Sequence, residues 1–302
     1  MKKINLHGII PPILTPMNED ESVNYEELKN QIERLIANGV DGIFCLGTNG
    51  EGYILSADEK CEIIHTTVKQ VNGRVPVYAG TGCISTGETI RLSRMAEELG
   101  ADVLSVITPS FAAASQRELY DHYSAVAEAV DMPIVLYNIP ARTGNKLLPE
   151  TVYALARDHE DIVGIKDSSG DWDNLSAYLQ LKSKLDKDFY VLSGNDSLIL
   201  KTLEAGGAGG IAGCANVYPE VLSSIYRYFA AGDIQKAKEA QDSIASLRAV
   251  FRYGNPNTII KKAVRMLGYS VGECRRPFNY LCPEGVQALQ AVLDENNDKG
   301  MK

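Results

Sequence analysis

The sequence has few of the residues that build metal centres and disulfide frameworks. It contains four histidines and six cysteines in 302 residues, and no two cysteines form a C-x-x-C pair. Zinc sites and redox motifs depend on such pairs or on histidines at helical spacing, and a chain of this length folds without disulfides. We therefore expect reduced cysteines that act as packing residues, and no metal site.

Long apolar runs and an excess of positive charge are also absent. No run approaches the roughly 20 apolar residues that span a bilayer, and the opening Met-Lys-Lys-Ile-Asn-Leu-His-Gly lacks a signal-peptide core. The net charge is −9 at pH 7, whereas nucleic acids and anionic membranes are bound through clustered Lys and Arg. The expected protein is cytoplasmic and binds neither nucleic acid nor membrane.

What the sequence does contain is an alternation of short apolar runs with longer amphipathic stretches. This alternation predicts strands and helices that follow one another around a parallel sheet, and it recurs eight times. The eight expected strands are Gly8–Pro16, Asp41–Gly47, Val75–Gly80, Ala101–Pro109, Pro133–Asn138, Ile162–Lys166, Tyr190–Gly194 and Gly209–Gly213. Eight repeats favour a closed (β/α)8 barrel over an open doubly wound sheet, which has the same alternation.

Capping signals support the expected helices. Ser56 stands three residues before Glu59, which is the spacing of a capping box, and Thr86 is expected to cap the following helix. The repeat ends near Ala231, and the remainder has helical patterns only, without a flexible linker before it. We therefore predict a barrel over residues 1–231, with its active site at the C-terminal ends of the strands, and a helical extension over 232–302 packed on it.

Lys166 is the most informative residue, because it ends the apolar run Asp-Ile-Val-Gly-Ile and is expected to project into the barrel mouth. Apolar neighbours lower the pKa of a lysine, so that its neutral amine becomes available to attack a ketone and form a Schiff base. Pairing with the adjacent Asp167, or binding of a phosphate, would explain the same position equally well.

Polar residues lie at the ends of two other expected strands. Tyr137 ends the strand before Lys166, where its hydroxyl can exchange protons with a substrate, although a packing role in the core is the alternative. Arg142 can clamp a carboxylate through its two-pronged guanidinium, or form a surface or interface ion pair instead. The loop Gly47–Gly52 offers hydroxyl, amide and backbone N–H groups that suit a small anion.

Three motifs occur in a recognisable order: Gly47-Thr48-Asn49-Gly50-Glu51, then Tyr137-Asn138-Ile139-Pro140-Ala141-Arg142-Thr143-Gly144, then Gly164-Ile165-Lys166-Asp167-Ser168-Ser169-Gly170. With them, essentially the whole chain resembles the dihydrodipicolinate synthase and N-acetylneuraminate lyase family. The resemblance implies a class I aldolase without metal or organic cofactor, which forms a covalent Schiff base on Lys166 with pyruvate or the pyruvate end of a 2-oxo acid.

The resemblance also implies roles for individual residues. Tyr137 would act as general acid and base, and Thr48 would link it to a proton relay. Thr48 and Asn49 would hold the pyruvate carboxylate, and Gly194 and Ile211 match positions that line the pocket. Arg142 matches the arginine with which dihydrodipicolinate synthases bind the carboxylate of aspartate semialdehyde.

Within the family, the chain is most similar to the dihydrodipicolinate synthases, which condense pyruvate with aspartate semialdehyde in lysine biosynthesis. The resemblance further implies a homotetramer built from tight dimers. Two departures, Asn49 in place of a threonine and Phe111 in place of a tyrosine that reaches the neighbouring subunit, give weight to an alternative. That alternative is an N-acetylneuraminate lyase or a 2-keto-3-deoxy sugar acid aldolase or dehydratase. A non-catalytic relative that binds a small oxo acid is a third hypothesis, against which Lys166 and Tyr137 argue.

Overall fold

The computed structural model describes residues 4–301. These residues form two compact units, one made of residues 4–7 and 76–211 and the other of residues 8–75 and 212–301. The expected boundary at residue 231 rests on a different criterion, the end of the strand and helix repeat, and stays a prediction.

The first unit alternates strands and helices throughout. Its strands are β3 (Val77–Gly80), β4 (Val103–Ile107), β5 (Ile134–Asn138), β6 (Ile162–Asp167), β7 (Tyr190–Ser193) and β8 (Gly209–Ile211). Its helices are α3 (Thr86–Glu98), α4 (Gln116–Ala127), α5 (Pro140–Thr143), α6 (Pro149–Asp158), α7 (Trp172–Leu181) and α8 (Ile199–Glu204), with short 3-10 turns η1 (Lys182–Lys184) and η2 (Asp196–Leu198).

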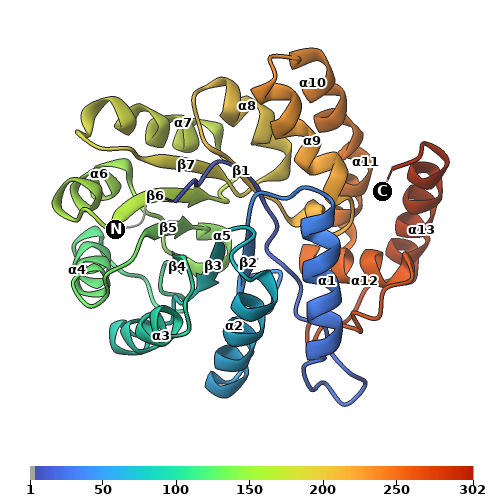
Figure 1. Ribbon diagram of the computed structural model, residues 1–302, viewed down its shortest axis with the longest axis horizontal. Coiled ribbons are helices and arrows are strands. Elements are labelled where there is room, and N and C mark those ends of the chain that lie inside the picture. The colour runs from blue at the N-terminus through green and yellow to red at the C-terminus, as the bar shows by residue number, and fades with distance from the viewer. Residues whose placement is uncertain (1–3, 302) are drawn as a thin grey trace. The chain divides into compact units, whose positions relative to one another are not determined.

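These six strands pair in parallel in the order β3-β4-β5-β6-β7-β8, and α3, α4, α6 and α7 lie outside them (Figure 1). Each strand is apolar along most of its length because parallel strands are covered on both faces. In the register of the pairs, Ile107 lies beside Tyr137, and Tyr137 lies beside Lys166. The polar residues at the ends of β5 and β6 are therefore direct neighbours.

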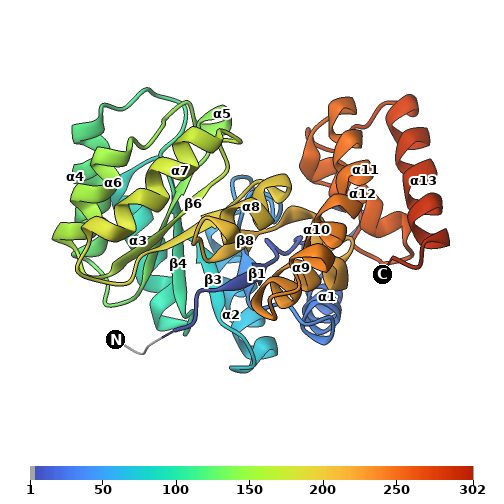
Figure 2. The same cartoon turned by 90° about the horizontal axis from the view of Figure 1, so that it is seen from above.

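The second unit combines residues 8–75 with residues 212–301. It contains β1 (Gly8–Ile10), α1 (Tyr25–Ala37), β2 (Ile43–Cys45) and α2 (Ala57–Val71), and then η3 (Gly213–Asn216), α9 (Pro219–Ala230), α10 (Ile234–Ser243), α11 (Ala245–Ala249), η4 (Val250–Tyr253), α12 (Pro256–Met266) and α13 (Pro283–Asp298). Helices α11, α12 and α13 lie together at the red end of the chain (Figure 2). The expected run of helices after residue 231 is thus present.

Two strands of this unit are shorter than the apolar runs that predict them. The first expected strand covers Gly8–Pro16, but β1 stops at Ile10 because Pro11 and Pro12 have no N–H to donate to a neighbouring strand. The second stops at Cys45, since Leu46 adopts a left-handed backbone with φ of 60°. Apolar character continues beyond both strand ends because the chain stays buried there.

Helix caps agree with the sequence at α2 and differ at α3. Ser56 and Glu59 form the expected capping box, with both reciprocal hydrogen bonds present. At α3 the N-cap is Ser85, whose side chain accepts a hydrogen bond from the Glu88 N–H, so the expectation of Thr86 is wrong by one residue. The Thr86 hydroxyl lies 2.9 Å from His122 Nδ1 instead, and links α3 to α4.

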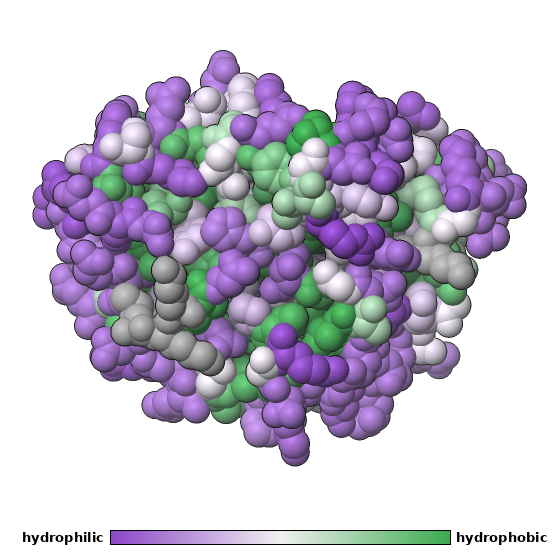
Figure 3. All heavy atoms as spheres, turned by 45° about the horizontal axis from the view of Figure 1, so that its top comes forward, coloured by the Kyte–Doolittle hydropathy of each residue, from purple (hydrophilic) through white to green (hydrophobic). Residues whose placement is uncertain are grey.

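The interior is built from aliphatic side chains, and the surface shown in Figure 3 is mostly hydrophilic, with hydrophobic residues in small separate areas. No helix within residues 4–301 combines the length and apolar character that a bilayer crossing needs.

Candidate active site

Lys166 lies near the end of β6 with its side chain almost completely buried. Only 3 % of the residue is exposed, and its Nζ lies 3.8 Å from the centre of the Tyr137 ring. The parallel register of β5 and β6 produces this contact, since it sets Tyr137 directly beside Lys166. An amine held against an aromatic face in a buried position has lost most of the hydration that stabilises its charged form.

The pKa of Lys166 reflects this burial. Loss of hydration lowers the pKa below the ordinary value of 10.5, while the Tyr137 hydroxyl and the Asp196 carboxylate partly counteract the decrease. Asp196 begins η2, directly after β7, and is itself 97 % buried, with an exposed fraction of 3 %. Lowering the pKa increases the fraction of neutral amine, which is the form that attacks a carbonyl carbon.

Asp167 does not pair with Lys166, although it is the next residue. Its Oδ1 accepts a hydrogen bond of 2.7 Å from Asn138 Nδ2, and its Oδ2 accepts one of 2.7 Å from the Ser169 hydroxyl. Successive side chains of a strand point to opposite faces, so the carboxylate and the amine are directed away from each other. This geometry argues against the simple ion-pair explanation of Lys166.

Gly194 follows β7 at a position where no side chain fits. A Cβ placed there would lie 1.9 Å from Ser168 Oγ and 2.9 Å from Lys166 Cε. The absence of a side chain therefore leaves room for the stem of Lys166. Ile211, at the end of β8, is buried with 1 % of its surface exposed.

Arg142 lies in α5, the single helical turn that follows β5, and its side chain is exposed. The loop after β5 is joined to the loop after β4 by Asn145. Asn145 Nδ2 donates to the carbonyl oxygens of Pro109 and Ala112, at 2.9 and 2.8 Å, and its Oδ1 accepts from the Ala114 N–H. These bonds fix the loop after β4.

That loop carries Phe111, which is 98 % exposed and has a φ of 80°. A left-handed backbone is unfavourable for a bulky residue, and the exposed ring gains nothing from burial within the chain. The strain persists because Asn145 holds the loop on both sides of Phe111.

In the second unit, the loop Gly47–Gly52 connects β2 to α2 and contains Thr48 and Asn49. Both residues are half-buried. The Thr48 carbonyl accepts a hydrogen bond of 2.8 Å from Asn257 Nδ2 of α12. A Cβ on Gly213 would lie 2.6 Å from Asn49 Nδ2, so this glycine leaves room for the amide.

A buried ion pair lies behind the same loop. Lys261 Nζ is 2.6 Å from Glu51 Oε1, and the two side chains are 1 % and 0 % exposed. Lys261 also donates to the Thr15 carbonyl, and the Arg275 N–H donates to Glu51 Oε2. In the second unit, the loop Gly47–Gly52 is thus held in place by the buried ion pair of Lys261 and Glu51.

Four of these residues had no expected role: Asp196, Asn145, Asn257 and Lys261. A signal existed for Lys261, because it lies on the apolar stripe of its helix, three residues after Thr258 and three before Val264. A lysine in such a stripe needs a buried partner. Glu51 was part of a motif but was given no function.

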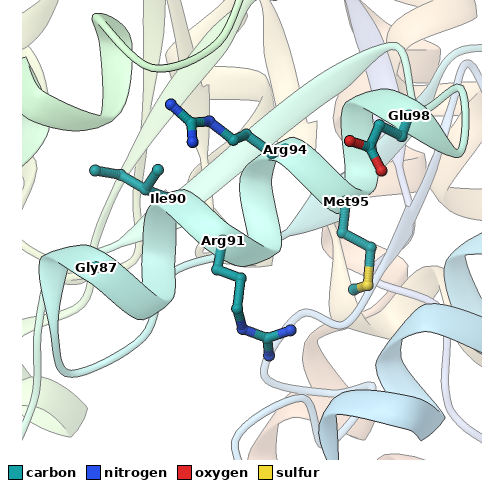
Figure 4. Close-up of a pocket in the computed structure, with 6 residues that line it drawn as sticks. All are labelled: Gly87, Ile90, Arg91, Arg94, Met95 and Glu98. Carbon is teal, nitrogen blue, oxygen red and sulfur yellow. The ribbon is translucent and has the colours of Figure 1, made fainter.

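One surface hollow outside these loops lacks the character of a site. A surface hollow over α3 is lined by Gly87, Ile90, Arg91, Arg94, Met95 and Glu98, which project from one helix in several directions (Figure 4). Arg91 is paired there with Glu88 of the same helix. Within residues 4–301, no three His, Cys, Asp or Glu side chains are grouped so that they could hold a metal ion.

A buried strand-end lysine against a tyrosine, on parallel strands, is an arrangement that suits α/β enzymes that work through a lysine Schiff base. Comparison with known proteins identifies the family. The family model described as Dihydrodipicolinate synthetase family matches residues 5–296. The chain belongs to this family.

Individual relatives agree with this assignment. A 4-hydroxy-tetrahydrodipicolinate synthase of Methanopyrus kandleri is 40% identical over 290 residues, which are 95% of each chain. The crystal structure of dihydrodipicolinate synthase from Aquifex aeolicus, 36% identical, matches with a TM-score of 0.92 over 97% of this chain and 98% of that one. A prophage protein of the family from E. coli K12, solved in complex with pyruvate, is 32% identical and matches with a TM-score of 0.93 over 97% and 99%.

These likenesses confirm the predicted fold class, a (β/α)8 barrel with C-terminal helices. They also confirm the predicted enzyme class, a lyase of the class I aldolase type, and favour the synthases over the sialic acid and sugar acid alternative. Enzymes of this family form a Schiff base between pyruvate and a lysine and need no external cofactor. The comparisons do not assign roles to individual residues.

Proposed function

We propose that this protein acts as a 4-hydroxy-tetrahydrodipicolinate synthase, which condenses pyruvate with aspartate semialdehyde. One observation carries the assignment of the reactive residue: the buried amine of Lys166 contacts the Tyr137 ring, and its pKa is lowered by burial. Relatives with the synthase name cover 95% of the chain and support the choice of substrates.

In the first step, the neutral Lys166 amine attacks C2 of pyruvate, the carbonyl oxygen leaves as water, and a protonated imine forms. The oxygen needs two protons to leave as water, and the attacking nitrogen loses one. Tyr137 is placed beside the amine and relays these protons.

In the second step, the protonated imine withdraws electrons from the methyl carbon, which loses a proton and becomes an enamine carbon. This carbon attacks the aldehyde carbon of aspartate semialdehyde, and a carbon–carbon bond forms. A proton converts the resulting alkoxide into a hydroxyl group. The amino group that came from aspartate semialdehyde then attacks the imine carbon, closes the ring and displaces the Lys166 amine, which completes the cycle.

The remaining residues bind the substrates. Strands of a (β/α)8 barrel present their C-terminal ends on one face, so loops after different strands contribute to one site. Thr48 and Asn49 bind the pyruvate carboxylate, with Thr48 also in the proton relay of Tyr137. Arg142 binds the carboxylate of aspartate semialdehyde, and Gly194 and Ile211 line the pocket.

The proposal extends to assembly and location. The proposed assembly is a homotetramer, and contact between copies is supported by Phe111, whose exposed ring on a fixed loop suits a second copy of the chain. A cytoplasmic location is supported by six cysteines without disulfides. The barrel and its extension are proposed to divide at residue 231.

The test is reductive trapping. Borohydride added with pyruvate reduces the imine to a stable secondary amine, and peptide mass mapping should place the modification on Lys166. Lys166→Ala should give no modified protein and no turnover, whereas Tyr137→Phe should form product roughly 100-fold more slowly or worse because a general acid and base is lost.

Lys182→Ala is the matched control, because Lys182 is an exposed lysine outside the strands and its loss should leave trapping unchanged. Modification of another lysine in the wild-type protein would disprove the mechanism. Release of pyruvate from N-acetylneuraminate, without condensation of aspartate semialdehyde, would assign the chain to the alternative activity.

A further inference from the structure

We infer that Lys261 and Asn257 of α12, with Glu51, are positioning residues for pyruvate. They fix the backbone of the loop Gly47–Gly52 so that Thr48 and Asn49 can bind a carboxylate. The role of the loop rests on the proposed function, whereas the fixing of its backbone rests on contacts within the second unit alone.

The loop needs external support because its backbone is strained at both ends. Leu46, just before it, has a φ of 60°, and Glu51 has a φ of 56°. Neither residue is a glycine, and left-handed backbone is unfavourable for side chains that branch or extend from Cβ. Such conformations persist only where surrounding contacts determine them.

Asn257 fixes the peptide group between Thr48 and Asn49. Its Nδ2 donates to the Thr48 carbonyl at 2.8 Å, and Asn257 is 3 % exposed. The Thr48 carbonyl and the Asn49 N–H belong to one planar peptide unit and point in opposite directions. Holding the carbonyl against α12 therefore directs the Asn49 N–H away from α12, where it can donate to a substrate.

Lys261 and Glu51 fix the other end of the loop. Glu51 accepts from Lys261 Nζ with one oxygen and from the Arg275 N–H with the other, at 2.6 and 2.8 Å. Lys261 also donates to the Thr15 carbonyl at 2.7 Å, and the Thr15 hydroxyl donates to the Gly50 carbonyl at 2.6 Å. The Gly50 carbonyl is thus held by Thr15, and both oxygens of the Glu51 side chain are held by Lys261 and Arg275.

A purely stabilising role explains this arrangement less well. Burial of an ion pair is costly, and apolar residues of the same volume often stabilise a protein equally or better. Here the ammonium of Lys261 reaches two segments, the residues after β1 and the loop after β2. An apolar pair would fill the volume but would not determine the direction of these peptide groups.

The experiment compares five variants of the full-length protein: Lys261→Met, Glu51→Gln, the double variant with both changes, Asn257→Ala, and Lys262→Met as control. Lys262 is adjacent on α12, but its ion pair with Glu273 is only partly buried. Each variant is assayed for its melting temperature, for its KM and kcat, for pyruvate-dependent trapping of Lys166, and for hydrogen exchange of the segment 46–52.

We expect Lys261→Met, Glu51→Gln and Asn257→Ala to raise the KM for pyruvate roughly tenfold or more, because misplaced binding groups lose affinity, while kcat changes less. Hydrogen exchange of segment 46–52 should be faster. In the double variant the melting temperature should recover, since no buried charge is left without a partner, but KM and exchange should stay altered. Lys262→Met should match the wild type.

Recovery of KM and of exchange in the double variant, or normal values in the folded Asn257→Ala protein, would overturn the inference. Asn257→Ala leaves no unpaired charge. It therefore provides a folded variant even if Lys261→Met and Glu51→Gln prevent folding. If the wild-type protein is not trapped with pyruvate, the proposed function fails. Hydrogen exchange then still tests whether Lys261, Asn257 and Glu51 fix the loop backbone. Unchanged exchange of segment 46–52 in their variants would disprove this.

Discussion

Lys166 is subject to opposing influences on its charge. Burial removes water from the amine and lowers its pKa, whereas the Tyr137 hydroxyl and the Asp196 carboxylate raise it. Strong burial without such neighbours would keep the amine neutral but would also destabilise the cationic imine of the proposed mechanism. The Asp196 carboxylate, which is buried as well, can stabilise that cation.

The pH dependence of imine formation should report this balance. Asp196→Asn removes a carboxylate that raises the pKa of Lys166, so the pKa should fall further and the neutral amine should persist to lower pH. The rate of pyruvate-dependent trapping, measured against pH, should therefore reach half its plateau at a lower pH than in the wild type.

Asp186→Asn is the control, because Asp186 is exposed and does not influence the pKa of Lys166. A profile for Asp196→Asn that is unchanged, or displaced to higher pH, would contradict the assigned influence of Asp196.

Some residues of the candidate site can be predicted from the sequence and others cannot. Lys166 and Tyr137 were found because each ends an apolar run, and strand ends of a barrel face the active site. Lys261 was not found, because its environment depends on Glu51, which is 210 positions away in the chain. A buried charge is identified by its partner, and distant partners leave no local pattern.

Among the elements, α2 is held at its N-terminus from two directions. Within the helix, the Glu59 side chain accepts from the Ser56 N–H and completes the capping box. From outside, Arg275 donates to both oxygens of Glu59, at 3.1 and 2.6 Å. The segment that follows α12 therefore stabilises the first turn of α2.

Removal of this carboxylate should lower the stability of the protein. Glu59→Gln should cost about 1–2 kcal/mol at neutral pH, because a charge-assisted pair and part of a cap are lost. The pKa of Glu59 is lowered from 4.5 to about 2, chiefly by Arg275. The carboxylate thus stabilises the fold fully above pH 4.5, and the difference from the variant should vanish as the pH falls through about 2.

Urea unfolding at a series of pH values measures this difference. Glu88→Gln is the control, since Glu88 forms an exposed pair with Arg91 on α3 and its loss should cost less than about 0.5 kcal/mol. An equal effect of both variants, or an effect of Glu59→Gln that grows toward low pH, would contradict the assignment.

The positions of elements were easier to predict than their ends. Each of the eight expected strands overlaps an observed strand, because apolar runs mark buried segments. Strand ends depend instead on hydrogen bonding, which Pro11 and the left-handed Leu46 interrupt while the chain is still buried. Burial and strand pairing are separate properties, and the sequence pattern reports the first.

At the scale of the whole molecule, residues far apart in the chain build the second unit. Arg275 and Glu59 are separated by 216 positions, and Lys261 and Thr15 by 246. The fold class followed from the repeat of short elements, which is a local pattern. The division into two units, with residues 8–75 and 212–301 in one of them, follows from distant contacts and was not foreseen.

Phe111 provides a test of assembly at this scale. An aromatic ring that is 98 % exposed on a strained but fixed loop gains free energy only when another molecule covers it. If a second copy does so, Phe111→Ser should weaken self-association by roughly tenfold or more in dissociation constant, as loss of a central aromatic contact does. Sedimentation velocity over a range of protein concentrations measures this change.

Tyr280→Ser separates a specific effect from a general loss of apolar surface. Tyr280 is also a strongly exposed aromatic residue, at 73 %, but it belongs to the segment before α13 rather than to a strand-end loop of the first unit. Its replacement should leave the sedimentation profile unchanged. If Phe111→Ser sediments like the wild type as well, Phe111 is not buried between copies, and the assembly must use another surface.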